Sequence, residues 1–454
     1  MVGVPVRKWR NWQTRRPQEP VGETPWEFKS PLPHHALYLL AEPMTKPSAA
    51  LGAVAPSGVH PQTLAGLLVL ASLAILMLVG SRADPVFGMF AVLGVGIGVT
   101  LQRSRFCFNS AFRDLIQFRS GRTMKGVIVG MTVATAGFGV HMHNLLPNPS
   151  LGPIAPEAHV IPLSVALLVG GILFGIGMVV AGGCTSGSLY RIGEGYLASW
   201  VSVAGILAGL VLVSHHWNWW WQHAIRRAPV VWLPRYLGYG GAVAATLIGL
   251  GLAYGLVLWI ESRGGVGVQE FTAPASVRSF HEKLHEIVAA VFGRGWPAPV
   301  GGAVLGFLNV LSYTAHMPWR VVGELSRWGN AAAAVVGLGP GPLQGTDELS
   351  ACVVTVGGGV FTHGFLLNVG LIGGSLAAAL LAHEFKWRIP RRPVRYLQSL
   401  FGGVFMGYGS GLALGCTAGA FFSAVPSLAV NGWIFAMALV AGASIGLRAI
   451  HWIP

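Results

Sequence analysis

A short glycine-rich motif with a cysteine and a threonine at its end occurs twice in the chain. The first copy reads GIGMVVAGGCTSG over 175–187, and the second reads GYGSGLALGCTAG over 407–419. A third cysteine, Cys107, lies in the stretch QRSRFCFNSAFRD over 102–114. The candidate site residues in these stretches are Arg105, Cys107, Asn109, Gly183, Cys184, Thr185, Ser186, Gly415, Cys416 and Thr417.

These residue types suit the binding of a small anion. Glycines permit the tight turns at which a membrane helix can break, and Thr185, Ser186 and Thr417 are good N-cap residues for a short helix after the break. The N-terminus of such a helix favours an anion. A cysteine thiol is a weak donor on a polarizable sulfur, which suits a ligand that itself carries sulfur. The Asn109 amide could orient an anion or could instead cap a helix.

Three other interpretations of these residues stay open. The glycines could simply let helices pack closely. The cysteines could be nucleophiles of a membrane sulfurtransferase or redox enzyme that forms a persulfide, although no His or acid adjoins Cys184 or Cys416 in the motif. A soft-metal site could also use the histidines of the predicted outside loops, which are His141, His143, His215, His216 and His223.

The elements that must position the motifs are apolar helices. Of the 454 residues 53% are hydrophobic, 10% are charged and 64 are glycine, against about 25% charged residues in an average soluble domain. This composition excludes a typical soluble enzyme, a disordered chain and a disulfide scaffold. Apolar runs are predicted at 64–80, 86–101, 126–141, 161–181, 197–214, 240–260, 298–315, 364–382, 397–414 and 431–448.

The distribution of basic residues predicts an orientation in the membrane. With an inside N-terminus and ten crossings, 24 of the 30 Lys and Arg residues fall on the inner side. The net charge of +14 is therefore interpreted as an orientation signal and not as a nucleic-acid surface. Residues 1–60 contain no spanning run and are predicted to be a mobile cytoplasmic tail, followed by one transport domain over 61–454.

The duplicated motif predicts an internal repeat, with halves at about 86–214 and 298–448. An odd number of crossings separates equivalent segments, so the two halves should run in opposite directions through the membrane. Inverted repeats are typical of secondary transporters whose site lies at the repeat interface. We therefore expect an all-α polytopic protein with about nine to ten membrane segments and short re-entrant helices.

At the three motifs the sequence resembles the YeeE/YedE family of membrane proteins, which includes bacterial thiosulfate transporters. The resemblance is carried by QRSRFCFNSAFRD, GGCTSG and GCTAG and extends over about 64–450. It implies two pseudo-symmetric helical halves and a central path lined by Cys107, Cys184 and Cys416. It also implies a partner, a small cytoplasmic sulfur carrier of the TusA type. The second half has no cysteine equivalent to Cys107, and Ala418 replaces Ser186.

The expected function is the transport of thiosulfate or a related small sulfur anion into the cytoplasm across a bacterial inner membrane. No cofactor or metal is expected, and no Gly-x-x-x-x-Gly-Lys-Ser/Thr stretch is present to bind a nucleotide. The remaining cysteine, Cys352, lies outside either copy of the repeat and is interpreted as structural.

Overall fold

The computed structural model describes residues 60–150, 152–263, 295–346, 349 and 361–450. The chain divides into two compact units, residues 1–58 and 59–454. Residues 1–58 of the predicted tail fall in the first unit, and the tail up to residue 59, like Cys352, lies outside the described residues. All that follows concerns the second unit.

The described part of this unit is helical and has two isolated β-bridges but no strand. Its helices are α1 (Pro61–Ala83), α2 (Pro85–Ser104), α3 (Phe108–Phe118), α4 (Arg122–Leu145), α5 (Val165–Ala181), α6 (Thr185–Gly193), α7 (Leu197–Trp220), η2 (Trp221–Ile225), α8 (Pro234–Ser262), α10 (Ala298–Ala315), α11 (Val322–Val335), α12 (His363–Leu381), α13 (Val394–Leu412), η5 (Thr417–Ser423) and α14 (Val430–Ile450). Each of the ten predicted apolar runs coincides with one of the longer helices.

The membrane-spanning capacity of these helices agrees with the expected number of segments. Within the described ranges, nine helical stretches are long and apolar enough to cross a membrane. A tenth is the pair formed by α13 and η5, which is bent by 47° at the second motif. The described structure is therefore that of an all-α polytopic membrane protein.

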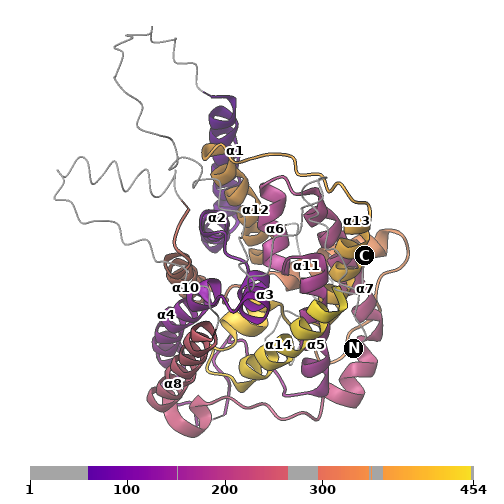
Figure 1. Ribbon diagram of the computed structural model, residues 1–454. Coiled ribbons are helices and arrows are strands. Elements are labelled where there is room, and N and C mark those ends of the chain that lie inside the picture. The colour runs from indigo at the N-terminus through magenta and orange to yellow at the C-terminus, as the bar shows by residue number, and fades with distance from the viewer. Residues whose placement is uncertain (1–59, 151, 264–294, 347–348, 350–360, 451–454) are drawn as a thin grey trace, which may run out of the picture. The chain divides into compact units, whose positions relative to one another are not determined.

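The two motif copies form breaks between a long helix and a short one. Helix α5 has Ser164 as its N-cap, whose side chain accepts a hydrogen bond from the backbone N–H of Leu167, and Gly182 as its C-cap. Gly182 has a φ of 78°, a left-handed conformation that favours glycine. Helix α6 then starts after Cys184. Figure 1 shows the short helices α3, α6 and α11 among the longer ones.

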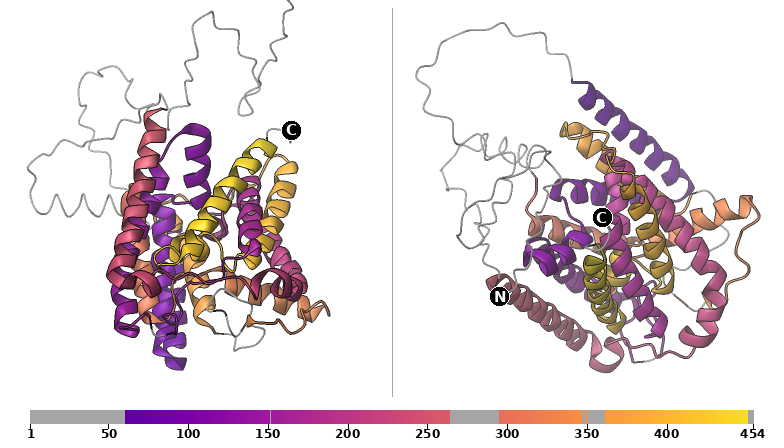
Figure 2. Two further views of the ribbon diagram at one scale, coloured as in Figure 1. Left: turned by 90° about the horizontal axis from the view of Figure 1, so that it is seen from below. Right: turned by 45° about the vertical axis from the view of Figure 1, so that its right-hand side comes forward.

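Glycines bring the long helices into close contact, as the packing interpretation expected. A methyl group added at Gly94 of α2 would lie 2.3 Å from the carbonyl oxygen of Leu367 in α12. In the same way, a methyl group at Gly302 of α10 would lie 1.9 Å from the carbonyl oxygen of Gly126 in α4. Helix α8 packs on the outer side of α4, and Figure 2 (left) shows the two running alongside each other. Close packing therefore accounts for many glycines outside the motifs.

The helices that carry the two motifs run in opposite directions. Gly170 of α5 approaches Gly409 of α13, whereas Gly177, farther along α5, approaches Gly402, which comes earlier in α13. Helices α5 and α13 are therefore antiparallel, which confirms the predicted inversion of the two halves.

The packing of the other helices repeats when each helix is replaced by its counterpart in the other half. Helix α2 packs on α12, and α10 packs on α4; α13 packs on α7, and α5 packs on α14. The same correspondence matches α1, which packs on α12, with α8, which packs on α4. We propose that each repeat begins one helix earlier than the sequence predicted, at α1 and at α8.

Candidate functional site

Two of the predicted cysteines meet in the interior. Cys107 precedes α3 and Cys184 precedes α6, and both side chains are buried. Their sulfur atoms lie 3.9 Å apart, a weak hydrogen-bond distance in which either thiol can donate. Both cysteines are free, because a disulfide would require sulfur atoms about 2.05 Å apart.

The hydrogen bonds of Cys184 show that it is the N-cap of α6. Its sulfur accepts from the backbone N–H of Gly187 at 3.3 Å and lies 3.6 Å from the Ser186 hydroxyl oxygen. The expectation that Thr185 or Ser186 caps this helix was wrong by one or two positions, because the chain resumes helical geometry at Thr185. The same shift occurs in the second copy, where Cys416 occupies the N-cap position and Thr417 begins η5.

The two motif threonines do not cap their helices, and their hydroxyl groups are buried. Thr185 and Thr417 are both 0% exposed. Neither hydroxyl oxygen has a hydrogen-bond partner among the described residues. A buried polar group without a partner costs about 1–3 kcal/mol, so each copy of the motif holds an unsatisfied polar group at the same position.

An aromatic cluster joins the two halves beside the sulfur pair. The ring centroids of Phe108 and of Phe422 in η5 lie 5.5 Å apart. The ring centroid of Trp319, which precedes α11, lies 5.9 Å from that of Phe422. Asn309 supports this cluster, since its side-chain oxygen accepts from the Trp319 backbone N–H at 2.7 Å and its amide donates to Ser423 at 3.1 Å. Phe422 and Ser423 were not predicted as site residues, because nothing in the second motif marks the residues that follow it.

The remaining predicted residues fall in different surroundings. Asn109 is buried in α3, and its side-chain oxygen has no partner within the described ranges. Arg105, by contrast, has a 75% exposed side chain that pairs with Glu384 at 3.5 Å, so it lies outside the buried group around the sulfurs. Cys416 is fully buried at the start of η5, a segment that packs against α6.

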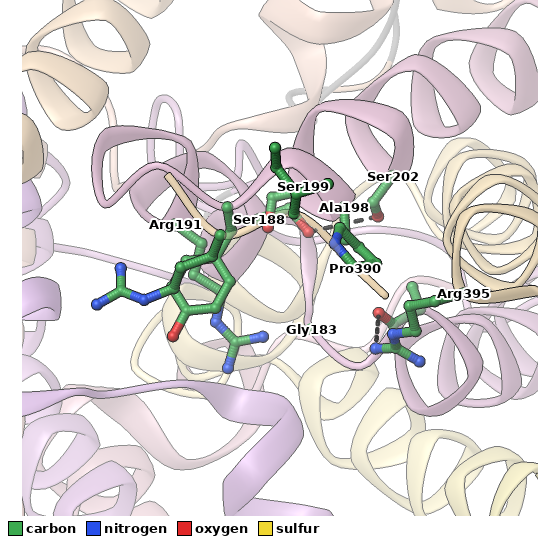
Figure 3. A pocket seen from close by; sticks show the side chains of 12 residues that line it. Gly183, Ser188, Arg191, Ala198, Ser199, Ser202, Pro390 and Arg395 are labelled. Atoms are coloured by element: carbon green, nitrogen blue, oxygen red, sulfur yellow. Dashed lines mark hydrogen bonds between the residues drawn. The ribbon is translucent and has the colours of Figure 1, made fainter. Parts of the chain in front are cut away.

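A basic cavity of about 300 Å³ adjoins the first motif. Gly183 forms part of its wall, and the guanidinium groups of Arg191, Arg388 and Arg395 line it. Figure 3 shows Arg191 and Arg395 at its two ends, with serines of α6 and α7 near them. Sequence reasoning counted these arginines only as orientation signals, although Arg191 follows Cys184 by two helical turns.

A buried histidine adjoins the second motif. A methyl group added at Gly415 would lie 3.1 Å from Cε1 of His159. His159 is fully buried, and neither ring nitrogen has a partner among the residues described. Burial, and secondarily the charge of Arg320, lowers the pKa of His159 from 6.5 to about 3, so the ring is neutral at physiological pH. No local pattern in the sequence indicates this contact, because His159 and Gly415 belong to different halves.

The histidines proposed as metal ligands do not lie in loops. His141 and His143 belong to α4, His215 and His216 to α7, and His223 to η2. Among the described residues, no group of three or more His, Cys, Asp or Glu side chains is arranged to hold a metal ion.

Comparison with known proteins shows which family and which proteins this chain is similar to. The family described as "Sulphur transport" matches residues 103–445. The chain is similar to a thiosulfate transporter, TsuA, of Spirochaeta thermophila, with 30% identity over 77% of this chain and 95% of that protein. A thiosulfate transporter TsuA of Escherichia coli is 25% identical over 77% of this chain and 91% of its own length.

A shorter similarity links the chain to a second type of relative. The probable transporter YedE of Escherichia coli is 33% identical over 34% of this chain and 36% of its own length.

Proposed function

This chain belongs to the sulphur transport family, and we propose that it carries thiosulfate or a related small sulfur anion into the cytoplasm along a path lined by Cys107, Cys184 and Cys416. Membership confirms the resemblance found at the three motifs and makes the chain a transporter and not an enzyme. The names of the two relatives matched over most of their length, both of which are thiosulfate transporters, support this substrate.

The observation that carries the proposal is the paired chemistry of the two motif breaks. In antiparallel copies, each break buries a thiol next to a threonine hydroxyl that has no partner within the described residues. A buried polar group without a partner calls for a physical reason, and a ligand that supplies the missing partner is one such reason. Thiosulfate can accept hydrogen bonds at both its oxygen atoms and its terminal sulfur, so the hydroxyl and thiol donors suit it.

The sulfur pair supports passage by short steps between weak donors. Thiols hold an anion less tightly than guanidinium groups do, which allows each step to be reversible. Conduction requires sites that are favourable to enter but weak enough to leave. The 3.9 Å separation of Cys107 and Cys184 is short enough for one anion to contact both thiols.

We further propose that the N-terminus lies inside and that the substrate moves inward across a bacterial inner membrane. The excess of basic residues in the stretches next to Cys107 and after α12 supports this orientation. A small cytoplasmic sulfur carrier of the TusA type would then receive the anion at that face.

The test is uptake of radiolabelled thiosulfate into proteoliposomes that contain the full chain. We expect saturable uptake that falls at least tenfold in Cys184→Ala and in Cys416→Ala. Cys352→Ala, at the cysteine outside the two motif copies, is the matched control and should retain uptake. Uptake that survives both motif substitutions would contradict the cysteine path, and folded protein without any uptake would contradict the substrate.

Mass spectrometry of the turned-over protein separates this mechanism from the persulfide alternative. A path built on hydrogen bonds leaves Cys107, Cys184 and Cys416 unmodified, whereas a sulfurtransferase would leave an added sulfur atom on one of them.

A further inference from the structure

The basic cavity beside the first motif is built by both halves of the repeat. Helix α6 contributes Arg191, and the segment between α12 and α13 contributes Arg388. Two backbone hydrogen bonds join these parts, from Arg388 N–H to the Gly195 carbonyl at 2.8 Å and from Leu197 N–H to the Arg388 carbonyl at 3.2 Å. The cavity wall is therefore held in place by the fold and does not depend on a single flexible side chain.

The guanidinium groups of the cavity are anchored by neutral carbonyl groups. Arg191 donates to the Gly182 carbonyl at 2.6 Å, Arg395 to that of Ala181 at 2.8 Å, and Arg388 to that of Glu194 at 2.7 Å. No carboxylate of the described residues lies within 4 Å of any of the three. Each guanidinium has five N–H donors, so all three keep donors for a ligand.

The charge of the cavity is therefore positive, and its hydroxyl groups add further donors. Glu194, an acid whose backbone carbonyl binds Arg388, has a pKa raised by burial and lowered in part by Arg388 and Arg191. Ser199 and Ser202 of α7 line the cavity next to Ser188, which lies 3.4 Å from Ser202. The volume of about 300 Å³ exceeds the ~30 Å³ share of one water, which leaves room for a small anion.

We propose that this cavity is a binding site for a doubly charged tetrahedral oxyanion, held by Arg191, Arg388 and Arg395, at the mouth of the path beside Gly183. Guanidinium groups bind such anions through paired N–H donors. They recognise oxygen atoms and charge, so the cavity binds sulfate and thiosulfate alike, and selection for the terminal sulfur falls to the cysteines. The role of the cavity as a holding site for the transported anion rests on the proposed function, whereas oxyanion binding does not.

The test is titration of the full chain with sulfate and with thiosulfate by isothermal calorimetry, in nanodiscs of zwitterionic phosphatidylcholine. We expect Kd values for the two anions within about threefold of each other, and weakening of about tenfold or more in Arg388→Gln. The matched control is Arg391→Gln, which removes the same charge from an exposed neighbour outside the cavity and should bind as the unmodified chain does. Size-exclusion profiles and thermal midpoints verify that both variants fold, and Arg388→Lys should bind with intermediate affinity.

A Cys184→Ala background distinguishes failure of this proposal from failure of the proposed function. Binding of both sulfate and thiosulfate that persists in this background, with or without thiosulfate uptake, supports the cavity as an independent site. Thiosulfate binding that is lost with Cys184, or equal binding by the two arginine variants, would place the anion elsewhere and overturn the proposal. The absence of saturable sulfate binding would overturn it as well.

The phosphate of an anionic lipid headgroup is an alternative ligand to a free oxyanion, since basic pockets between membrane helices can hold such a phosphate. The titration is therefore repeated in nanodiscs that contain phosphatidylglycerol. Unchanged sulfate affinity supports a site for the free oxyanion. If the sulfate affinity of the unmodified chain collapses in the anionic discs, and no arginine variant restores it in those discs, the cavity would be assigned to a lipid headgroup.

Discussion

Gly187 is the residue whose substitution most directly tests the sulfur pair. It is the third residue of α6, and an added methyl group would lie 2.9 Å from the Cys107 sulfur and 3.0 Å from the Cys184 sulfur. Ordinary van der Waals contacts of such a carbon are 3.4–4 Å long. Gly187→Ala therefore forces both sulfurs to move, by roughly half an ångström or more, without removing either thiol.

The expected energies separate an effect on transport from an effect on folding. Replacing glycine with alanine inside a helix stabilises it by roughly 0.5–1 kcal/mol, and overpacking a close-packed site costs about 1–3 kcal/mol. The net change in the free energy of unfolding is therefore a loss of about 0–2.5 kcal/mol, which leaves the protein folded. Misplacement of a positioning group by about 1 Å can cost about a hundredfold in rate, so we expect thiosulfate uptake to fall at least tenfold.

The assay is initial-rate uptake into proteoliposomes, with Gly251→Ala as the matched control. Gly251 lies in α8, where an added methyl group meets nothing within 4 Å. This control should keep normal uptake and gain slightly in thermal stability. If Gly187→Ala folds and transports as fast as the unmodified chain, the sulfur pair is not in the path and the reasoning is refuted.

Three further substitutions test the threonines, the buried histidine and the helix packing. Thr185→Val removes a hydroxyl without a described partner, so it should raise stability by about 1–3 kcal/mol while lowering uptake; Thr246→Val, which breaks a 2.8 Å bond to a carbonyl, should lower stability and spare uptake. His159 has a folded pKa of about 3 against 6.5 unfolded, so its contribution to stability is lost as the pH falls below 6.5, by about 2 kcal/mol at pH 5; thermal midpoints of His159→Gln should show less of this acid sensitivity, and identical pH curves would disprove it. Gly98→Ala would place a methyl group 2.1 Å from the Leu371 carbonyl oxygen and should lower stability by about 3 kcal/mol, and an unchanged thermal midpoint would contradict the close packing of α2 on α12.

The predictions that the structure confirmed rest on local patterns. Apolar runs predicted all ten long helices because in a membrane the backbone of a spanning segment must be satisfied within that segment. The inversion of the repeat was also predictable, since it depends only on the number of crossings between equivalent motifs. The N-cap positions were wrong because cysteine is a rare cap, and only the bond from Gly187 N–H to Cys184 reveals it.

The N-terminal orientation, the substrate path and the sulfur-carrier partner stay predictions, since basic residues and motifs do not report a direction of transport. The premise of the metal interpretation was wrong, because His143, His215, His216 and His223 continue helices that the hydropathy pattern ended too early, and His141 lies at the end of the predicted run 126–141. Polar and aromatic residues at the end of a membrane helix lower local hydropathy without breaking the helix.

By itself the sequence determined the helices, the two breaks and the family, because hydropathy, glycine spacing and motif residues are properties of neighbouring positions. Only the tertiary structure decided which groups that are distant in the chain meet. It brought Cys107 to Cys184, placed His159 against Gly415, and gathered Arg191 with Arg388 around a cavity. Each contact joins residues at least 77 positions apart in the chain, and the last two join one half of the repeat to the other, so no local pattern encodes the pairing.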